Sequence, residues 1–163
     1  MLIYELSEKK RHTVKTQYVV GTDGKIESVS KPYEGKKHDF DIYKDQKNRD
    51  RFHGVPKKTD SGYQGIKNYD KDAEIPFKKP KKGELTIEQK KYNHELSKKR
   101  IKVENVIREV KIFKILSESY RNRRKNHSIK TNIVAGIVNM KVEKRNRKVA
   151  KYEKNQRNNR TLL

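Results

Sequence analysis

Alternating apolar and polar residues near the start of the chain predict a β-hairpin. In residues 13–20, Val14, Thr16 and Tyr18 alternate with polar neighbours, which indicates a half-buried strand. Residues 21–24 read Gly-Thr-Asp-Gly and favour a tight turn. Residues 26–30 repeat the alternation more weakly, so they are the expected partner strand.

Two segments further along have helical patterns. Residues 38–46 predict a short helix, and Thr86 and Gln89 have the spacing of a capping box. The apolar residues that follow share one helical face: Leu96, Val103, Ile107 and Val110. Residues 86–117 should therefore form one long helix or two abutting helices.

A last helix is expected to begin near Ser128. Its predicted apolar stripe is Ile129, Ile133, Ile137 and Met140. Residues 141–163 hold nine Lys and Arg against two Glu and few apolar residues, so we expect them to be a frayed or disordered basic tail. The predicted division of the chain is 1–140 and 141–163.

The composition indicates a basic protein that meets a polyanion. Lys and Arg number 43 against 21 Asp and Glu, which gives a net charge of +22, and 31% of the residues are apolar. Nucleic acid is the commonest partner of so basic a domain. The absence of Cys excludes a disulfide scaffold, a thiolate zinc site and a Cys nucleophile. No apolar run approaches the roughly 20 residues of a membrane span, so we expect a cytoplasmic protein.

Five short motifs occur in one order along the chain. They are residues 10–17 (KRHTVKTQ), 38–40 (HDF), 59–66 (TDSGYQGI), 92–97 (YNHELS) running into 100–104 (RIKVE), and 120–124 (YRNRR). Together they resemble the catalytic half of a bacterial insertion-sequence transposase. The resemblance is to the DDE superfamily, in the group related to Harbinger-type endonucleases, and it covers roughly residues 9–140.

The resemblance implies an α/β fold, a mixed RNase H-like sheet with flanking helices. It also implies metal-dependent DNA cleavage and strand transfer at transposon ends, with three carboxylates holding two Mg²⁺ or Mn²⁺ ions. Asp60 resembles the second of these carboxylates and Glu104 the third, so the two should lie within about 10 Å of one another. Asp39 is either a further carboxylate of the site or a helix cap.

The chain departs from the family's pattern at its start. The family's first catalytic Asp precedes the segment at residues 10–17, but residues 1–12 contain Glu5 and Glu8 and no Asp. We therefore expect an N-terminally truncated catalytic domain that lacks one metal ligand and is inactive. Such a fragment would act at the bacterial nucleoid if it binds DNA.

Simpler interpretations of the same residues stay open. Asp60 could be a turn residue, and Glu104 could form an ion pair with Arg100 or Arg108 on a helix surface. The candidate phosphate-binding cations are Lys98, Lys99, Arg100, Arg121, Arg123 and Arg124. The alternatives to a transposase fragment are a non-catalytic basic nucleic-acid-binding protein and a remnant that forms a homo-oligomer or associates with an intact transposase.

Overall fold

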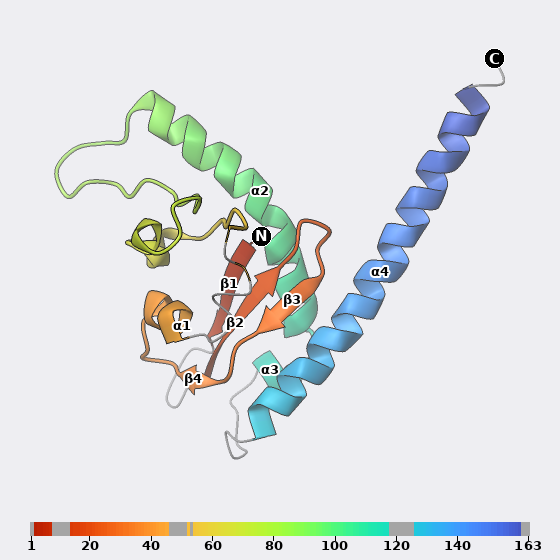
Figure 1. Ribbon diagram of the computed structural model, residues 1–163, viewed down its shortest axis with the longest axis horizontal. Helices are drawn as coiled ribbons and strands as arrows, with labels where there is room; N and C mark the ends of the chain where they lie inside the picture. The colour runs from red at the N-terminus through yellow and green to blue at the C-terminus, as the bar shows by residue number, and fades with distance from the viewer. Residues whose placement is uncertain (1, 8–13, 46–51, 53, 118–125, 161–163) are drawn as a thin grey trace.

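An antiparallel sheet with helices packed against it forms the body of the molecule (Figure 1). The structure is a computed structural model that describes residues 2–7, 14–45, 52, 54–117 and 126–160, with residues 2–7 and 159–160 described by their backbone alone. No helix in these ranges is long and apolar enough to cross a membrane. The α/β class agrees with the sequence, and the RNase H-like arrangement stays a prediction.

Strand β2 lies at the centre of the sheet. The strands in the described part of the chain are β1 (Leu2–Ser7), β2 (Val14–Val20), β3 (Ile26–Val29) and β4 (Tyr33–Glu34). β1 pairs antiparallel with β2 from Leu2–Val20 to Ser7–Lys15, and β3 and β4 pair antiparallel with β2 on its other edge. The predicted hairpin is therefore confirmed as β2–β3.

Both faces of β2 are buried, whereas the sequence predicted a half-buried strand. Successive side chains of a strand point to opposite faces. Tyr18 and Val20 accordingly pack into a core with the long helices, while Val19 packs into a second core with Tyr43 and Tyr63. The polar residues of β2 led to the prediction of one exposed face. Gln17 is buried nevertheless, and its side chain is hydrogen-bonded to the Tyr63 hydroxyl.

The helical predictions for the middle of the chain are confirmed. The helices are α1 (Asp39–Asp45), η2 (Ser61–Tyr63), η3 (Ile66–Asn68), α2 (Ile87–Lys111), α3 (Lys114–Ser117) and α4 (His127–Arg160). The capping box forms at the start of α2, where the Thr86 hydroxyl accepts from the Gln89 N–H at 3.2 Å and Gln89 Oε1 accepts from the Thr86 N–H at 3.1 Å. The predicted stripe of α2 is buried: Leu96, Val103, Ile107 and Val110.

The predicted apolar stripe of α4 is wrong. Its four residues, Ile129, Ile133, Ile137 and Met140, are all exposed, and the opposite face is buried instead. The buried face carries small residues that allow close packing: Thr131, Val134, Ala135, Val138 and Val142. Asn139 also fixes the orientation of the helix, because its amide group accepts from the Ile26 N–H at 2.7 Å and donates to the Ile26 carbonyl at 2.9 Å.

The segment expected to fray is helical as far as Arg160. Residues 141–160 contain no Gly or Pro that would end a helix. Glu143 forms an ion pair with Arg147 one turn on, at 2.6 Å, and Glu109 of α2 forms one with Arg145 at 2.7 Å. Helix α4 therefore continues past residue 140 without a break, and the division of the chain at that residue stays a prediction.

His127 should make the stability of the protein depend on pH. Burial, and secondarily the charge of Lys130, lower the pKa of His127 below its ordinary value of 6.5. The unfolded chain therefore takes up this proton more readily, so the stabilising contribution is present above pH 6.5 and is lost as the pH falls through the lowered pKa. We expect His127→Gln to flatten the decline of unfolding free energy below pH 6.5, measured by urea denaturation.

His94→Gln, at an exposed position of α2, provides the control for the His-to-Gln substitution itself. A wild-type decline that His127→Gln leaves equally steep would contradict the assignment.

Candidate active site

Asp60 lies in a tight turn that the sequence builds from its own side chain. The Asp60 carboxylate caps η2, and its Oδ1 accepts from the Gly62 N–H at 2.9 Å. The preceding segment forms an isolated parallel bridge, Lys58–Glu74, outside the named strands. The segment before Asp60 is not a strand of the sheet, because the described partners of β2 are β1, β3 and β4.

Asp39 and Asp60 meet at Gly62. Asp39 is the first residue of α1, and its Oδ2 lies 3.0 Å from the point where a Cβ on Gly62 would stand. Oδ1 of Asp60 lies 3.0 Å from the same point. The two carboxylates thus approach each other across the one residue of this turn that has no side chain.

Lys15 of β2 offsets part of the negative charge of this pair. Its ammonium lies 2.8 Å from Asp39 Oδ1 and donates to the Lys37 carbonyl at 3.0 Å. Two carboxylates side by side repel each other, and a cation between or beside them relieves that repulsion. No local motif in the sequence pointed to Lys15, whose side chain reaches Asp39 from strand β2 only in the folded chain.

A buried polar cluster packs against the turn that contains Asp60. The Lys57 side chain is 1% exposed and lies 2.7 Å from Asp70 Oδ1, and it also donates to the Phe52 carbonyl at 2.8 Å. The Tyr43 hydroxyl donates to the other oxygen of Asp70, and the Tyr43 ring meets the Tyr63 ring edge-on. Tyr63 belongs to η2, so this cluster holds the segment that follows Asp60. Nothing in the local sequence distinguishes the buried Lys57 from Lys58, which follows it and is half-buried.

Glu104 lies on α2 with its side chain exposed. Among the described residues, no hydrogen bond or ion pair joins Glu104 to Asp60, and none joins it to Arg100 or Arg108. Convergence of Glu104 with Asp60 therefore stays a prediction.

The carboxylate pair fits the donor chemistry of a hard divalent cation only in part. Two carboxylates are present, but Lys15 already neutralises one of them. In the described ranges, no group of three or more His, Cys, Asp or Glu side chains could hold a metal ion. The described residues therefore do not assemble the two-metal centre that the resemblance implies, and we derive no catalytic step through it.

Three of the six candidate DNA-binding cations can be placed. Lys98 and Lys99 are exposed on α2, where they form weak ion pairs with Glu95 at 3.4 Å and Glu74 at 3.6 Å, and Arg100 is half-buried. The other three lie outside the described residues: Arg121, Arg123 and Arg124.

Comparisons with known proteins identify the family. Residues 6–140 match the model of the DDE superfamily endonuclease. The chain is 43% identical, over 129 residues, to the probable transposase for insertion sequence element IS702 of Microchaete diplosiphon, an alignment that covers 78% of this chain and 46% of that protein. No solved structure gives a significant match. Because the family model covers most of the chain and the relative is 43% identical to it, the chain belongs to the DDE superfamily endonucleases.

Proposed function

We propose that the chain contributes DNA-binding residues and acidic-site residues to a transposase catalytic domain. The observation that carries the proposal is the Asp39–Asp60 pair at Gly62, which lies inside the family-matched residues. The chain spans about half the length of the relative it matches. Cleavage and joining of transposon ends at the bacterial nucleoid are accordingly proposed for the protein that contains this chain.

Asp60 and Glu104, together with Asp39, are the proposed ligands of Mg²⁺ or Mn²⁺. Carboxylate oxygens are the donors that both ions prefer. When bound, such an ion polarises a phosphodiester and stabilises the oxygen that leaves it. The family's RNase H-like arrangement would bring Glu104 of α2 towards the pair. The chain's own contribution is to hold the two aspartates together against their mutual repulsion.

Gly62→Ala should weaken cation binding. The added Cβ would lie 3.0 Å from an oxygen of each carboxylate, closer than ordinary contact, and would push the oxygens apart. Loss of ligand orientation of this kind lowers metal affinity by roughly tenfold to a hundredfold. We expect a decrease in Mn²⁺ affinity of about tenfold or more, measured by the electron paramagnetic resonance of free Mn²⁺.

Gly136→Ala provides the matched control. Nothing lies within 4 Å of the added Cβ, and the residue is exposed in α4. The control should therefore bind Mn²⁺ as the wild-type chain does, and it should gain about 0.5–1 kcal/mol of helix stability. Equal Mn²⁺ affinity of the wild-type chain and Asp60→Ala would show that the pair is not the cation site.

The 163-residue polypeptide should bind DNA without cleaving it. It contains acids at the second and third positions of the family's motif, and none of its residues before His12 is an aspartate. Two-metal catalysis requires ligands that hold both ions on the attacking and leaving oxygens. A displacement of about 1 Å at such a centre already lowers the rate by roughly a hundredfold.

An end-labelled duplex that carries the element's own terminus tests this expectation. The duplex is incubated with the purified chain and Mg²⁺ or Mn²⁺, and the products are separated on a denaturing gel. We expect no nicking at the terminus. Metal-dependent nicking that Asp60→Ala abolishes, and that the exposed control Asp72→Ala preserves, would contradict this expectation.

The ion pair of Lys15 with Asp39 favours one other function, a basic nucleic-acid-binding protein without chemistry. In that case the ammonium of Lys15, 2.8 Å from the carboxylate, is the permanent cation of the pair. DNA binding without any Mn²⁺ binding at Asp60 would support this function over the first.

A further inference from the structure

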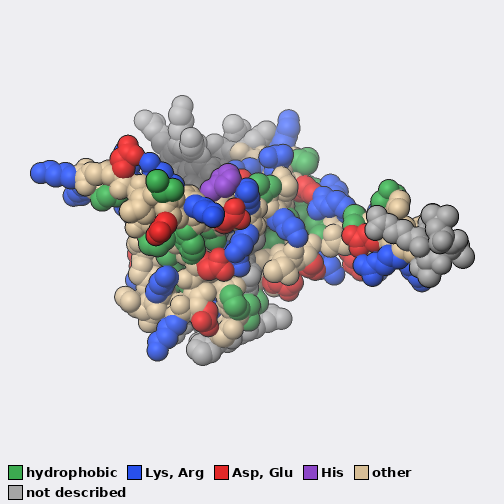
Figure 2. Space-filling model, turned by 90° about the horizontal axis from the view of Figure 1, so that it is seen from above, with side chains coloured by type: hydrophobic (Ala, Val, Ile, Leu, Met, Phe, Trp, Pro, Cys, Tyr) green, Lys and Arg blue, Asp and Glu red, His purple; other side chains and the backbone are tan. Residues whose placement is uncertain are grey.

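The C-terminal part of α4 projects from the body of the molecule (Figures 1 and 2). Every side chain of residues 144–158, which we name the helical arm, is exposed. The arm carries one acid, Glu153, against seven cations: Lys144, Arg145, Arg147, Lys148, Lys151, Lys154 and Arg157. It lies beyond residue 140, where the family match ends. The arm is thus a concentrated positive surface that the family resemblance leaves without a role.

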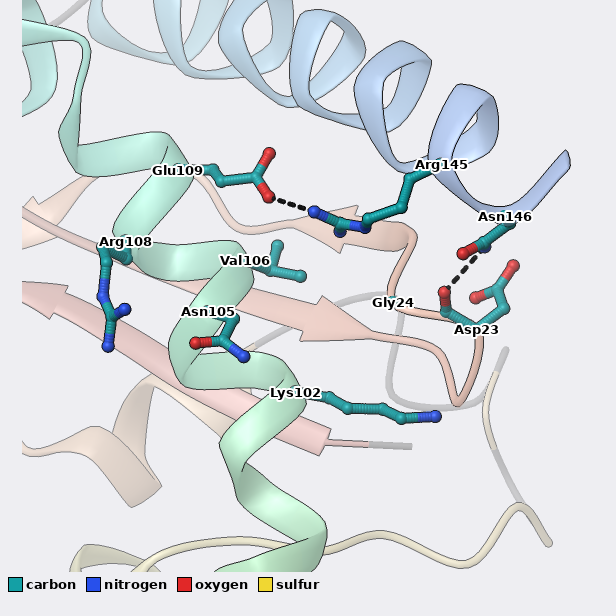
Figure 3. A pocket seen from close by; sticks show the side chains of 9 residues that line it. All are labelled: Asp23, Gly24, Lys102, Asn105, Val106, Arg108, Glu109, Arg145 and Asn146. Atoms are coloured by element: carbon teal, nitrogen blue, oxygen red, sulfur yellow. Dashed lines mark hydrogen bonds and ion pairs between the residues drawn. The ribbon is translucent and has the colours of Figure 1, made fainter. Parts of the chain in front are cut away.

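Contacts at its base fix the direction of the arm (Figure 3). Arg145 reaches Glu109 of α2 at 2.7 Å, and the Asn146 amide donates to the Asp23 carbonyl in the β2–β3 turn at 3.0 Å. These residues line a pocket of about 460 Å³ between the turn, α2 and α4. The arm is therefore held to the sheet at one end, and its side chains stay exposed along the rest of its described length.

The charge pattern of the arm destabilises its helical conformation. Lys144 and Lys148 lie one turn apart, as do Arg147 and Lys151, and like charges at this spacing destabilise a helix. An exposed helix has no buried apolar face to compensate for that repulsion. A polyanion that neutralises the cations would remove the repulsion and stabilise the helix.

We propose that the helical arm binds duplex DNA in the major groove, an inference that rests on the proposed DNA-binding function. A helix of 15 residues is about 22 Å long and roughly 10–12 Å wide. The major groove of B-form DNA is about 12 Å wide and admits one helix. The cations reach the phosphates on both sides of the groove, and the exposed amides of Asn155 and Asn158 face base edges that accept and donate hydrogen bonds.

The same geometry favours DNA over duplex RNA. The major groove of A-form RNA is deep and narrow, so side chains of an inserted helix cannot read it. Electrostatic attraction alone would act on both duplexes. The comparison of the two duplexes therefore separates groove binding by the arm from general attraction.

The experiment compares two variants of the full chain with the same change of charge. The arm variant is Lys148→Gln, Lys151→Gln, Lys154→Gln and Arg157→Gln, and the control is Lys67→Gln, Lys71→Gln, Lys81→Gln and Lys82→Gln, all at exposed positions. Affinity for a labelled 20-base-pair duplex, and for the RNA duplex of the same sequence, is measured by fluorescence anisotropy between about 50 and 200 mM salt. Circular dichroism shows whether both variants retain the fold.

For the arm variant we expect a loss of DNA affinity of at least about tenfold. The slope of log affinity against log salt concentration should become shallower by about 2–4, because each lost phosphate contact reduces the magnitude of this slope by roughly 0.9. The control should change little. Equal losses in both variants, or tighter binding of the RNA duplex, would overturn the role of the arm while leaving DNA binding intact. Absence of DNA binding by the wild-type chain would overturn the proposed function as well.

Discussion

Asp70→Asn is expected to lower the free energy of unfolding by about 3–5 kcal/mol. The substitution removes the carboxylate that lies 2.7 Å from the Lys57 ammonium, and the Lys57 side chain is almost completely buried. A buried charge that loses its partner keeps the full cost of leaving water. The Phe52 carbonyl still accepts one hydrogen bond from Lys57, but it supplies no opposite charge.

Two further variants separate the loss of charge pairing from other effects. Adding Lys57→Met to Asp70→Asn should recover much of the loss, since a buried ion pair can be replaced by apolar residues at little cost. Glu84→Gln is the exposed control: its ion pair with Lys90, also 2.7 Å, is worth less than about 1 kcal/mol because water and salt screen it. Urea denaturation measures all four chains. An Asp70→Asn chain as stable as Glu84→Gln would contradict the structural role of this cluster.

This cluster also connects stability with the candidate site. Tyr43 contacts both Asp70 and the ring of Tyr63, and Tyr63 follows directly on the turn of Asp60 and Gly62. The turn that brings Asp60 to Asp39 therefore rests on a polar cluster rather than on apolar packing alone.

Elements that are specified by their own residues could be predicted from the sequence. The β2–β3 hairpin follows from alternation on either side of a Gly-containing turn, and the start of α2 follows from the reciprocal hydrogen bonds of Thr86 and Gln89. The orientation of α4 could not be predicted in this way. Between His127 and Val142 the helix has two apolar faces, and contacts with the distant residue Ile26 decide which of them is buried.

The candidate site was predictable to a smaller extent. The resemblance singled out Asp60 and Glu104 by motif, and it left Asp39 open as a site residue or a cap. Their spacing along the chain carries no information on distance in the fold. Only the packing of α1 on η2 places an oxygen of Asp39 beside Gly62, and only the folded chain brings the Lys15 ammonium to Asp39. From the sequence alone, the buried Lys57 is expected to lie in a solvated basic loop, because its partner Asp70 is thirteen residues away along the chain.

A steep dependence of DNA affinity on salt is the largest effect expected of this chain. Its net charge of +22 is spread over the body, the α2 cations and the helical arm. Each phosphate that such a surface neutralises releases condensed counterions, so the logarithm of the affinity falls linearly with the logarithm of salt concentration. A protein that contacts six or more phosphates loses roughly a thousandfold or more in affinity between about 50 and 200 mM salt.

The affinity of the full 163-residue chain for labelled duplex DNA across this salt range tests most directly the proposal that the chain binds DNA. Fluorescence anisotropy with two duplexes of unrelated sequence gives both the slope and the sequence dependence. We predict tight binding of both duplexes at low salt and a logarithmic slope of about −5 or steeper, as six or more phosphate contacts require. Absence of binding at about 50 mM salt, or an affinity that salt leaves unchanged, would contradict the assignment of DNA as the partner.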